Sequence, residues 1–220
     1  MKLSFLIFIS CLMILKFSSI NSVTIECSYN YYEFFGNIEY DCLLKNKKIF
    51  TEDDVSIEEA KGQHLEGKTN DDVTTFRISD AKNLKSFPRN INNVFKNLKF
   101  LSIQLTKITE ITSEDLKVFP DLKYLSISGN EIKVIREDTF KFNPKLEEIY
   151  LFGNYIKYID RRTFSDLKNL KKLFLEGNTC SFQEASNKDQ VMKIVKEIEN
   201  GTCLIGKFQH FPDNWYYKAH

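Results

Sequence analysis

The chain has 220 residues, of which 42% are hydrophobic and 28% are charged, a composition typical of a soluble protein of one or two domains. Its 31 basic residues nearly balance its 30 acidic residues, which argues against nucleic acid or an anionic membrane surface as the main partner. Composition excludes these partners but identifies no function, so the function must be inferred from the order of the residues.

Residues 1–22 have the pattern of a secretory signal peptide. Lys2 gives a short positive start, residues 3–15 are almost continuously apolar, and small polar residues follow as far as Ser22. The apolar run is too short to span a bilayer comfortably, so an uncleaved membrane anchor is the less favoured alternative. We expect cleavage after Ser22; the loss of Lys2 and Lys16 then leaves 29 basic residues against 30 acidic ones. The sequence therefore predicts a secreted protein without a membrane span.

Residues 23–72 precede the periodic part of the chain and are expected to form an N-terminal cap. Tyrosine, phenylalanine and isoleucine are frequent between Tyr29 and Tyr40, and Gly36-Asn37 is a turn signal within this stretch. The polar residues 62–72 are expected to connect this cap to the repeats.

An internal repeat occupies residues 73–179. The copies follow the pattern L-x-x-L-x-L-x-x-N and begin at Val73, Leu98, Leu122, Leu146 and Leu170. Other apolar residues stand at some of the leucine positions, and Ala81 and Thr106 replace the asparagine in the first two copies. Successive starts are 25, 24, 24 and 24 residues apart. This pattern resembles the leucine-rich-repeat family, in the 24-residue form common in extracellular proteins. The resemblance covers about half of the chain, and the chain looks most like the small secreted insect members with few repeats and short caps.

The resemblance implies an α/β-type repeat solenoid, a horseshoe segment with a short parallel sheet on its concave side and a disulfide-tied cap at each end. In this family an asparagine amide satisfies the backbone groups buried at the turn after each strand. The expected asparagine ladder consists of Asn130, Asn154 and Asn178. Thr106 can satisfy part of these backbone groups and Ala81 cannot, so the first repeat is degenerate. Asn143 lies outside the ladder frame, so we expect Asn143→Ala to cost far less than Asn154→Ala.

Residues 180–206 are expected to form the C-terminal cap, followed by an aromatic tail over residues 207–220. An i, i+3, i+4, i+7 pattern predicts an amphipathic helix, with its apolar face made by Val191, Ile194, Val195 and Ile198. Asn187 and Gln190 form a plausible N-cap pair, and Asn200-Gly201 is a stop signal. Asn200-Gly201-Thr202 is also an N-glycosylation sequon, and a helix stop and a glycan can coexist there.

Four cysteines remain after the signal peptide is removed: Cys27, Cys42, Cys180 and Cys203. An even number in an oxidising compartment points to disulfides, and none of the four forms a C-x-x-C pair that would suggest zinc. Four cysteines allow three pairings. In a solenoid the caps are about 20 Å apart across five strands, whereas a disulfide needs Cα atoms within about 7 Å. This architecture permits only Cys27–Cys42 and Cys180–Cys203.

The sequence carries no signature of catalysis. It lacks the serine-hydrolase, zinc-protease, phosphate-loop and dinucleotide-binding motifs, and its three histidines are scattered outside the repeats. Repeat folds also work mainly as binding surfaces. We therefore expect no enzymatic activity, no catalytic residue, no cofactor and no metal.

Residues between the apolar positions of each strand are expected to point outwards on the concave side. Five aromatic residues there fall in neighbouring repeats: Phe100, Tyr124, Tyr150, Phe152 and Phe174. Clustered exposed aromatic residues usually mark a contact surface, which here would bind an extracellular protein. The alternatives are that the rings pack on one another or that a terminal segment, such as residues 207–220, covers them. Because the five residues alternate with core positions, we expect Tyr150→Ala with Phe152→Ala to leave the fold intact.

The sequence thus favours a secreted, non-enzymatic binding protein, with immune or receptor-like recognition as the setting that the resemblance suggests. Two other functions stay open: a structural matrix component that self-associates, and a carrier of a small apolar ligand. No oligomeric state follows from the sequence.

Peptide mapping without reduction is expected to recover Cys27 linked to Cys42 and Cys180 linked to Cys203, because only these pairs lie within one cap. A peptide that cross-links the two ends of the chain would exclude a solenoid.

Overall fold

The structure is a computed structural model that describes residues 21–34, 37–50, 55–180 and 184–204. The tail, residues 207–220, and all but the last two residues of the expected signal peptide lie outside these ranges. Within the described residues, no helix is long and apolar enough to cross a membrane.

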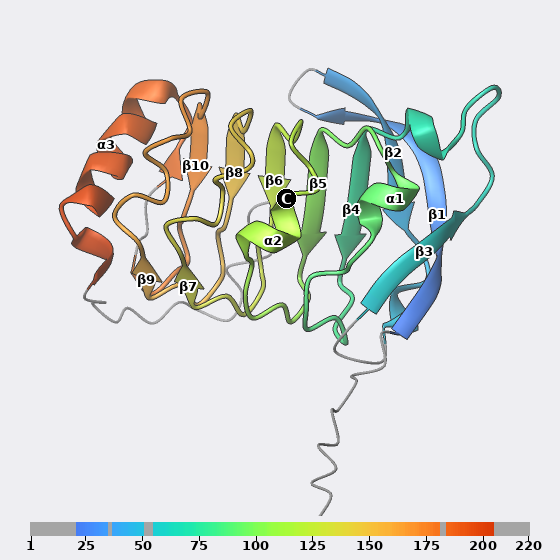
Figure 1. Cartoon of the computed structure of the whole chain (residues 1–220), viewed down its shortest axis with the longest axis horizontal. Coiled ribbons are helices and arrows are strands. Elements are labelled where there is room, and N and C mark those ends of the chain that lie inside the picture. The colour runs from blue at the N-terminus through green and yellow to red at the C-terminus, as the bar shows by residue number, and fades with distance from the viewer. Residues whose placement is uncertain (1–20, 35–36, 51–54, 181–183, 205–220) are drawn as a thin grey trace, which may run out of the picture.

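Strands stacked side by side run along the molecule from one end to the other (Figure 1). The five repeats contribute parallel strands: β4 (Thr75–Ser79), β5 (Phe100–Gln104), β6 (Tyr124–Ser126), β8 (Glu148–Tyr150) and β10 (Lys172–Phe174). In the register, Leu101 faces Leu125, Leu125 faces Ile149 and Ile149 faces Leu173. The 24-residue period thus places equivalent side chains of successive repeats above one another.

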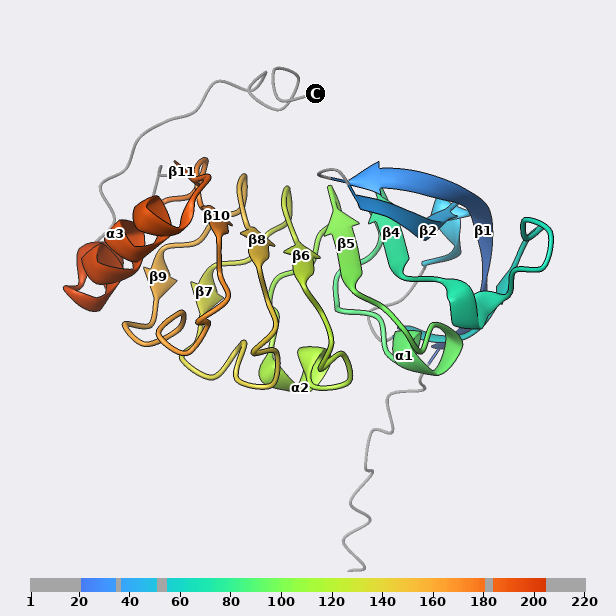
Figure 2. The same ribbon diagram turned by 90° about the horizontal axis from the view of Figure 1, so that it is seen from above.

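The opposite, convex side carries short elements. They are α1 (Ile91–Val94), α2 (Ser113–Leu116) and the paired strands β7 (Val134–Ile135) and β9 (Tyr158–Ile159). Seen from above, α1 and α2 lie across from the repeat strands (Figure 2). The space between the two sides is filled by fully buried leucine and isoleucine and by the stacked rings of Phe140 and Phe164, whose centroids are 5.7 Å apart. Each buried Leu or Ile contributes about 1.5–3 kcal/mol relative to an exposed one, so this shared core is the main source of stability.

The asparagine that follows each of the last three repeat strands is buried and bonds to the repeat before it. Asn154 Nδ2 donates to Leu151 O (3.0 Å) and to Ile127 O (2.8 Å), and its Oδ1 accepts from Ile132 N (3.2 Å). Asn178 makes the corresponding bonds one repeat later. One repeat earlier, Asn130 Nδ2 donates to Ile103 O and Ser128 O, and its Oδ1 accepts from Thr106 N. Because these backbone groups are inside the protein, each would be unsatisfied without the amide.

Asn143 corrects one expectation from the sequence. It lies outside the ladder, yet it is fully buried on the convex side, and its Nδ2 donates to Leu116 O (3.0 Å) and Phe119 O (2.8 Å). Its side chain thus satisfies two carbonyl groups of the preceding repeat. The prediction that Asn143→Ala costs little stability was therefore wrong. The repeat pattern accounts for the turn after the strand but not for contacts on the convex side.

The N-terminal cap continues the repeat sheet. It consists of β1 (Asn21–Phe34), β2 (Asn37–Leu44) and β3 (Val55–Lys61), with 3-10 turns η1 (Lys47–Ile49) and η2 (Asn70–Asp72). Strand β2 pairs with β4 in parallel and with β1 antiparallel, and β3 runs parallel to β1. The first residues of β1, Asn21 and Ser22, pair with Val55 and Ser56, so cleavage after Ser22 would remove the start of this strand.

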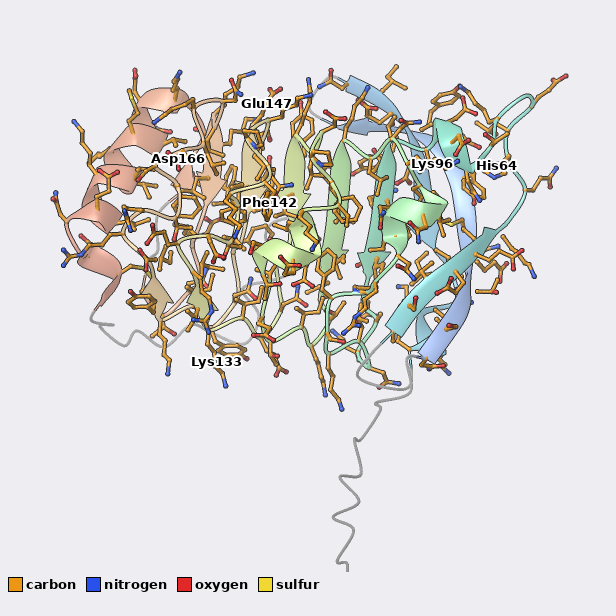
Figure 3. The ribbon with its side chains drawn as sticks, viewed as in Figure 1. His64, Lys96, Lys133, Phe142, Glu147 and Asp166 are labelled. Carbon is orange, nitrogen blue, oxygen red and sulfur yellow. A yellow bond between two sulfur atoms is a disulfide. The ribbon has the colours of Figure 1, made fainter. Side chains whose placement is uncertain are left out.

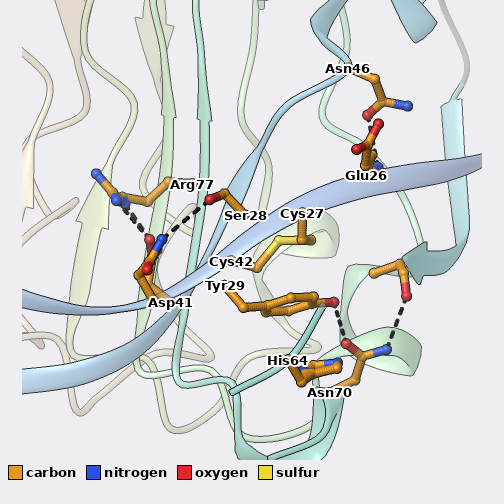
Figure 4. The surroundings of a disulfide bond; sticks show 12 residues. Glu26, Cys27, Ser28, Tyr29, Asp41, Cys42, Asn46, His64, Asn70 and Arg77 are labelled. Carbon is orange, nitrogen blue, oxygen red and sulfur yellow. Dashed lines mark hydrogen bonds and ion pairs between the residues drawn. A yellow bond between two sulfur atoms is a disulfide. The ribbon is translucent and has the colours of Figure 1, made fainter. Parts of the chain in front are cut away.

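The disulfide Cys27–Cys42 joins β1 to β2, and the connector after β3 packs beside it (Figure 4). Gly62 allows this approach: its φ is +148°, and a Cβ there would lie 2.4 Å from Cys27 O. Beyond this turn, the His64 ring stacks on Tyr29, with centroids 3.7 Å apart. The connector is therefore part of the cap.

The C-terminal cap consists of β11 (Glu184–Ala185), antiparallel to β10, then α3 (Lys188–Glu199) and η3 (Thr202–Leu204). Asn187 Oδ1 accepts from Gln190 N (3.0 Å), and Val191, Ile194 and Ile198 are buried against the last repeat. The disulfide Cys180–Cys203 joins the end of the repeats to the residues after α3. The predicted helix, its N-cap and both disulfide pairings are confirmed.

Replacement of Asn154 by alanine is expected to lower the free energy of unfolding by about 1–3 kcal/mol, because it strands buried backbone groups. Asn143→Ala should cost a similar amount for the same reason. The control is Asn169→Ala: this amide is exposed and its one bond, to Pro144 O (3.0 Å), can be replaced by water, so it should cost less than about 0.5 kcal/mol. Chemical denaturation measures all three. Equal losses for Asn154→Ala and Asn169→Ala would contradict the ladder.

Candidate binding surface

The five aromatic residues predicted to project from the concave side do lie there, but they are less exposed than the sequence suggested. Phe100 and Tyr150 are only 3% and 8% exposed, whereas Tyr124, Phe152 and Phe174 are half-buried. The expectation that all five rings face solvent was therefore wrong for Phe100 and Tyr150.

Packing of the rings on one another contributes to this burial. The Tyr150 and Phe174 rings stack almost in parallel, with centroids 4.7 Å apart and planes 6° apart. Phe100 and Tyr124 pack at a tilt, with centroids 6.1 Å apart. In both pairs one partner stands directly above the other, because the repeat register aligns them. The concave side therefore carries two packed aromatic pairs in neighbouring repeats.

A polar network holds Tyr150 in place. Its hydroxyl donates to Glu148, which is buried and also forms an ion pair with Lys172 (3.0 Å). Burial, followed by this contact with Glu148, raises the pKa of Tyr150 well above its usual range, so the phenol stays protonated and can donate. Removal of Tyr150 would leave Glu148 with one partner fewer and Phe174 without its stacked ring. The expectation that Tyr150→Ala with Phe152→Ala spares the fold is thus corrected.

The hairpin of β1 and β2 extends over the concave side of the first repeats, an arrangement that the sequence did not indicate (Figure 2). Asp41 forms a two-pronged ion pair with Arg77 of β4 (2.9 and 2.7 Å), and the Arg77 guanidinium lies 3.8 Å from the centre of the Tyr32 ring. Nearer the tip, Asn37 Nδ2 donates to Tyr124 Oη (3.4 Å). The hairpin therefore reaches the third repeat.

Two large apolar side chains remain exposed on this hairpin. Ile38 is 71% exposed and Tyr31 is 57% exposed. Both lie on the face of the hairpin opposite to Asn37 and Asp41, because successive strand residues alternate in direction and Tyr31 pairs with Tyr40. We define the concave surface as the outward residues of β6, β8 and β10, together with Asn37 near the tip of this hairpin.

Charged residues border this surface at the edge where the strands begin. Glu147 bridges two lysines of neighbouring repeats, Lys171 (2.6 Å) and Lys123 (3.3 Å), and these bonds hold the pKa of its carboxyl below the usual value. Figure 3 shows Glu147 at that edge. Aromatic residues inside a charged border are the usual composition of a protein-binding surface.

Glu176, just after β10, is a half-buried acid. Its Oε2 has no hydrogen-bond partner. Burial raises the pKa of its carboxyl from 4.5 to about 7, and the nearby charge of Glu184 in the C-terminal cap makes a smaller contribution in the same direction. The strand pattern in the sequence places Glu176 on the outward-facing side and gives no sign of this burial.

Two further expectations concern chemistry. Among the described residues, no three His, Cys, Asp or Glu side chains are arranged to hold a metal ion. Asn200 is exposed at the C-cap of α3, so its amide is accessible to a glycosylating enzyme, and glycosylation there stays a prediction.

A parallel stack of 24-residue repeats with a buried asparagine ladder and a capped core defines the leucine-rich-repeat fold. Residues 120–179 match the family model described as leucine rich repeat. The chain thus has a leucine-rich-repeat fold, with a match to the family model over residues 120–179 and a disulfide at each end of the solenoid.

Two solved structures are similar to part of this chain. One is the complex of TLR13 with ssRNA13, at 21% identity and a TM-score of 0.46, over 64% of this chain and 21% of that chain. The other is the complex of Toll with Spatzle from Drosophila, at 13% identity and a TM-score of 0.41, over 72% of this chain and 23% of that chain. The similarity thus spans less than a quarter of either of those chains. No curated protein matches the chain.

Glu176→Gln is expected to stabilise the protein at pH 8 but not at pH 4. The folded protein keeps the proton of Glu176 up to about pH 7, whereas the unfolded chain loses it near pH 4.5, so stability falls as the pH rises through this window. The glutamine removes this loss, and after discounting for partial exposure we expect a gain of about 1–2 kcal/mol at pH 8.

Thermal unfolding at both pH values measures this difference. Glu184→Gln serves as the comparison, because it removes only the smaller of the two causes and should give a smaller gain. An equal shift of the Glu176→Gln melting temperature at pH 4 and pH 8 would show that the carboxyl does not titrate in this window.

Proposed function

We propose that this chain is a secreted, non-enzymatic binding protein that recognises an extracellular protein through its concave surface. The observation that carries the proposal is the stack of Tyr150 on Phe174, held in place by the Glu148–Lys172 ion pair. A ring fixed in this way loses little conformational freedom when a partner binds, which is the property of an interface anchor.

A protein is the class of partner that this surface fits best. Half-buried Tyr124, Phe152 and Phe174 offer contact area at the centre, and the lysines joined by Glu147 provide a polar edge. The near balance of acidic and basic residues argues against nucleic acid, whose phosphates require an excess of positive charge.

The hairpin adds a second contact area. Asn37 at its tip lies against Tyr124, so a partner lying along β6, β8 and β10 would also meet the tip of the hairpin. Two disulfides support an oxidising extracellular location, and the resemblance to secreted leucine-rich-repeat proteins suggests immune or receptor-like recognition as the setting.

Phe152→Ala combined with Phe174→Ala is expected to weaken binding of the partner by about 2 kcal/mol or more, close to a 30-fold rise in Kd, because it removes ring area at the centre of the surface. The partner is first captured from the native extracellular fluid on the immobilised wild-type chain and identified, and its Kd is then measured by calorimetry. Both rings are half-buried, so the double variant should lose some stability with the Tyr150 stack but stay folded by circular dichroism.

Phe142→Ala is the matched control, because this ring is 41% exposed and lies on the convex side (Figure 3). If the control and the concave variant bind equally well, the partner does not use the concave surface. A mass that rises with protein concentration, in the absence of any captured partner, would instead support a self-associating matrix component.

A further inference from the structure

An apolar groove lies between the last repeats and the C-terminal helix. Its floor is formed by Phe164, Leu167 and Leu170 of the repeats and by Val191 of α3, all of which are less than 8% exposed. Met192, which is 49% exposed, stands at its rim, where an apolar side chain contacts water. This apolar floor and rim could bury a further apolar segment.

The shape of the groove limits what it can hold. Lys188 and Glu199 both line it and stand at the two ends of α3, eleven residues apart, which corresponds to a length of about 17 Å at 1.5 Å per residue. Its volume is about 330 Å³. A cavity of about 150 Å³ holds one benzene molecule, so the groove has room for two aromatic rings.

The chain continues from the end of this groove into a segment that contains aromatic residues. The disulfide Cys180–Cys203 fixes η3 (Thr202–Leu204) beside the end of α3, at the Glu199 end of the groove. The residues that follow, 205–220, lie outside the described part of the chain. They include Phe211 and Trp215, and the six residues 205–210 can span up to about 20 Å from the exit point.

The spacing of these two rings matches the groove. Phe211 precedes Pro212, which favours an extended backbone, and in an extended chain residues i and i+4 point to the same side about 13 Å apart. The segment 211–215 also carries one acid, Asp213, whereas the groove is lined by Lys168, Lys188 and Lys196. Its acidic lining residue, Glu199, already accepts a hydrogen bond from Ser165 (2.8 Å).

We propose that residues 211–215 of the same chain dock in this groove, with the rings of Phe211 and Trp215 against its apolar floor and the charge of Asp213 complementing the lysines that line it. In this proposal, residues 211–215 belong to the C-terminal cap. A second copy of the chain fits less well, because a stable interface buries about 800 Å² on each partner and this groove accommodates only two rings.

Trp215 is the only tryptophan of the chain, so its fluorescence reports on the tail alone. In the full chain we expect a blue-shifted emission that acrylamide quenches poorly. Met192→Lys places a charge at the rim of the apolar groove and should raise the quenching constant by about twofold or more, because burial of an unpaired charge is unfavourable. Phe142→Lys is the matched control: it makes the same kind of change at a similarly exposed convex site outside the groove and should leave quenching unchanged.

A second variant tests the docking from the side of the tail. Phe211→Ala should also raise the quenching of Trp215 and should expose the groove to a hydrophobic dye, while circular dichroism shows α3 intact. Three results would overturn the proposal. They are a Trp215 that is fully quenched in the wild-type chain, a Trp215 that responds to Phe174→Ala on the concave side but not to Met192→Lys, and a protection that disappears on dilution and therefore arises from a second copy.

Discussion

The buried turn after each repeat strand is the constraint on which the rest of this structure depends. To stack the repeats, the chain must turn through the interior, where backbone groups cannot reach water. Asn154 solves this by bonding both to its own repeat, at Leu151, and to the preceding one, at Ile127 and Ile132. The same bonds that satisfy the backbone therefore also fix the height of one repeat relative to the next.

This fixed register produces the concave surface. Tyr150 stacks on Phe174 because residues 24 positions apart stand above one another, and Lys172 reaches Glu148 for the same reason. The aromatic rings therefore form part of a rigid, mutually supported layer. Rigidity of this kind favours specific binding, because little freedom remains to be lost when a partner arrives. In the proposed function, Tyr150 would serve stability and recognition together, so the two roles would be separable only at less buried rings such as Phe152.

The two ends of the solenoid are covered in different ways. At the N-terminus the sheet continues into β2, and the Asp41–Arg77 ion pair anchors the hairpin that overhangs the first repeats. At the C-terminus the sheet continues only into the two-residue strand β11, and α3 covers the last repeat with one apolar face and leaves a groove on its flank. A cap that continues the sheet leaves fewer unpaired strand edges, whereas a helix laid across the end leaves a seam between itself and the repeats.

The sequence by itself determined the repeat frame, the core positions, the helix after Asn187 and both disulfide pairings. These features follow from local periodicity and from the fact that stacked repeats contact only their neighbours. Only the tertiary structure decided what lies against each outward position. Phe100 and Tyr150 alternate correctly with the core, yet strand periodicity states only which side a residue faces, and not what packs beside it. The contact of Asn37 with Tyr124, between residues 87 positions apart, lies outside any repeat pattern, and so does the convex role of Asn143. Contacts between the caps and the repeats depend on how the whole chain is arranged in space, and no local pattern encodes them.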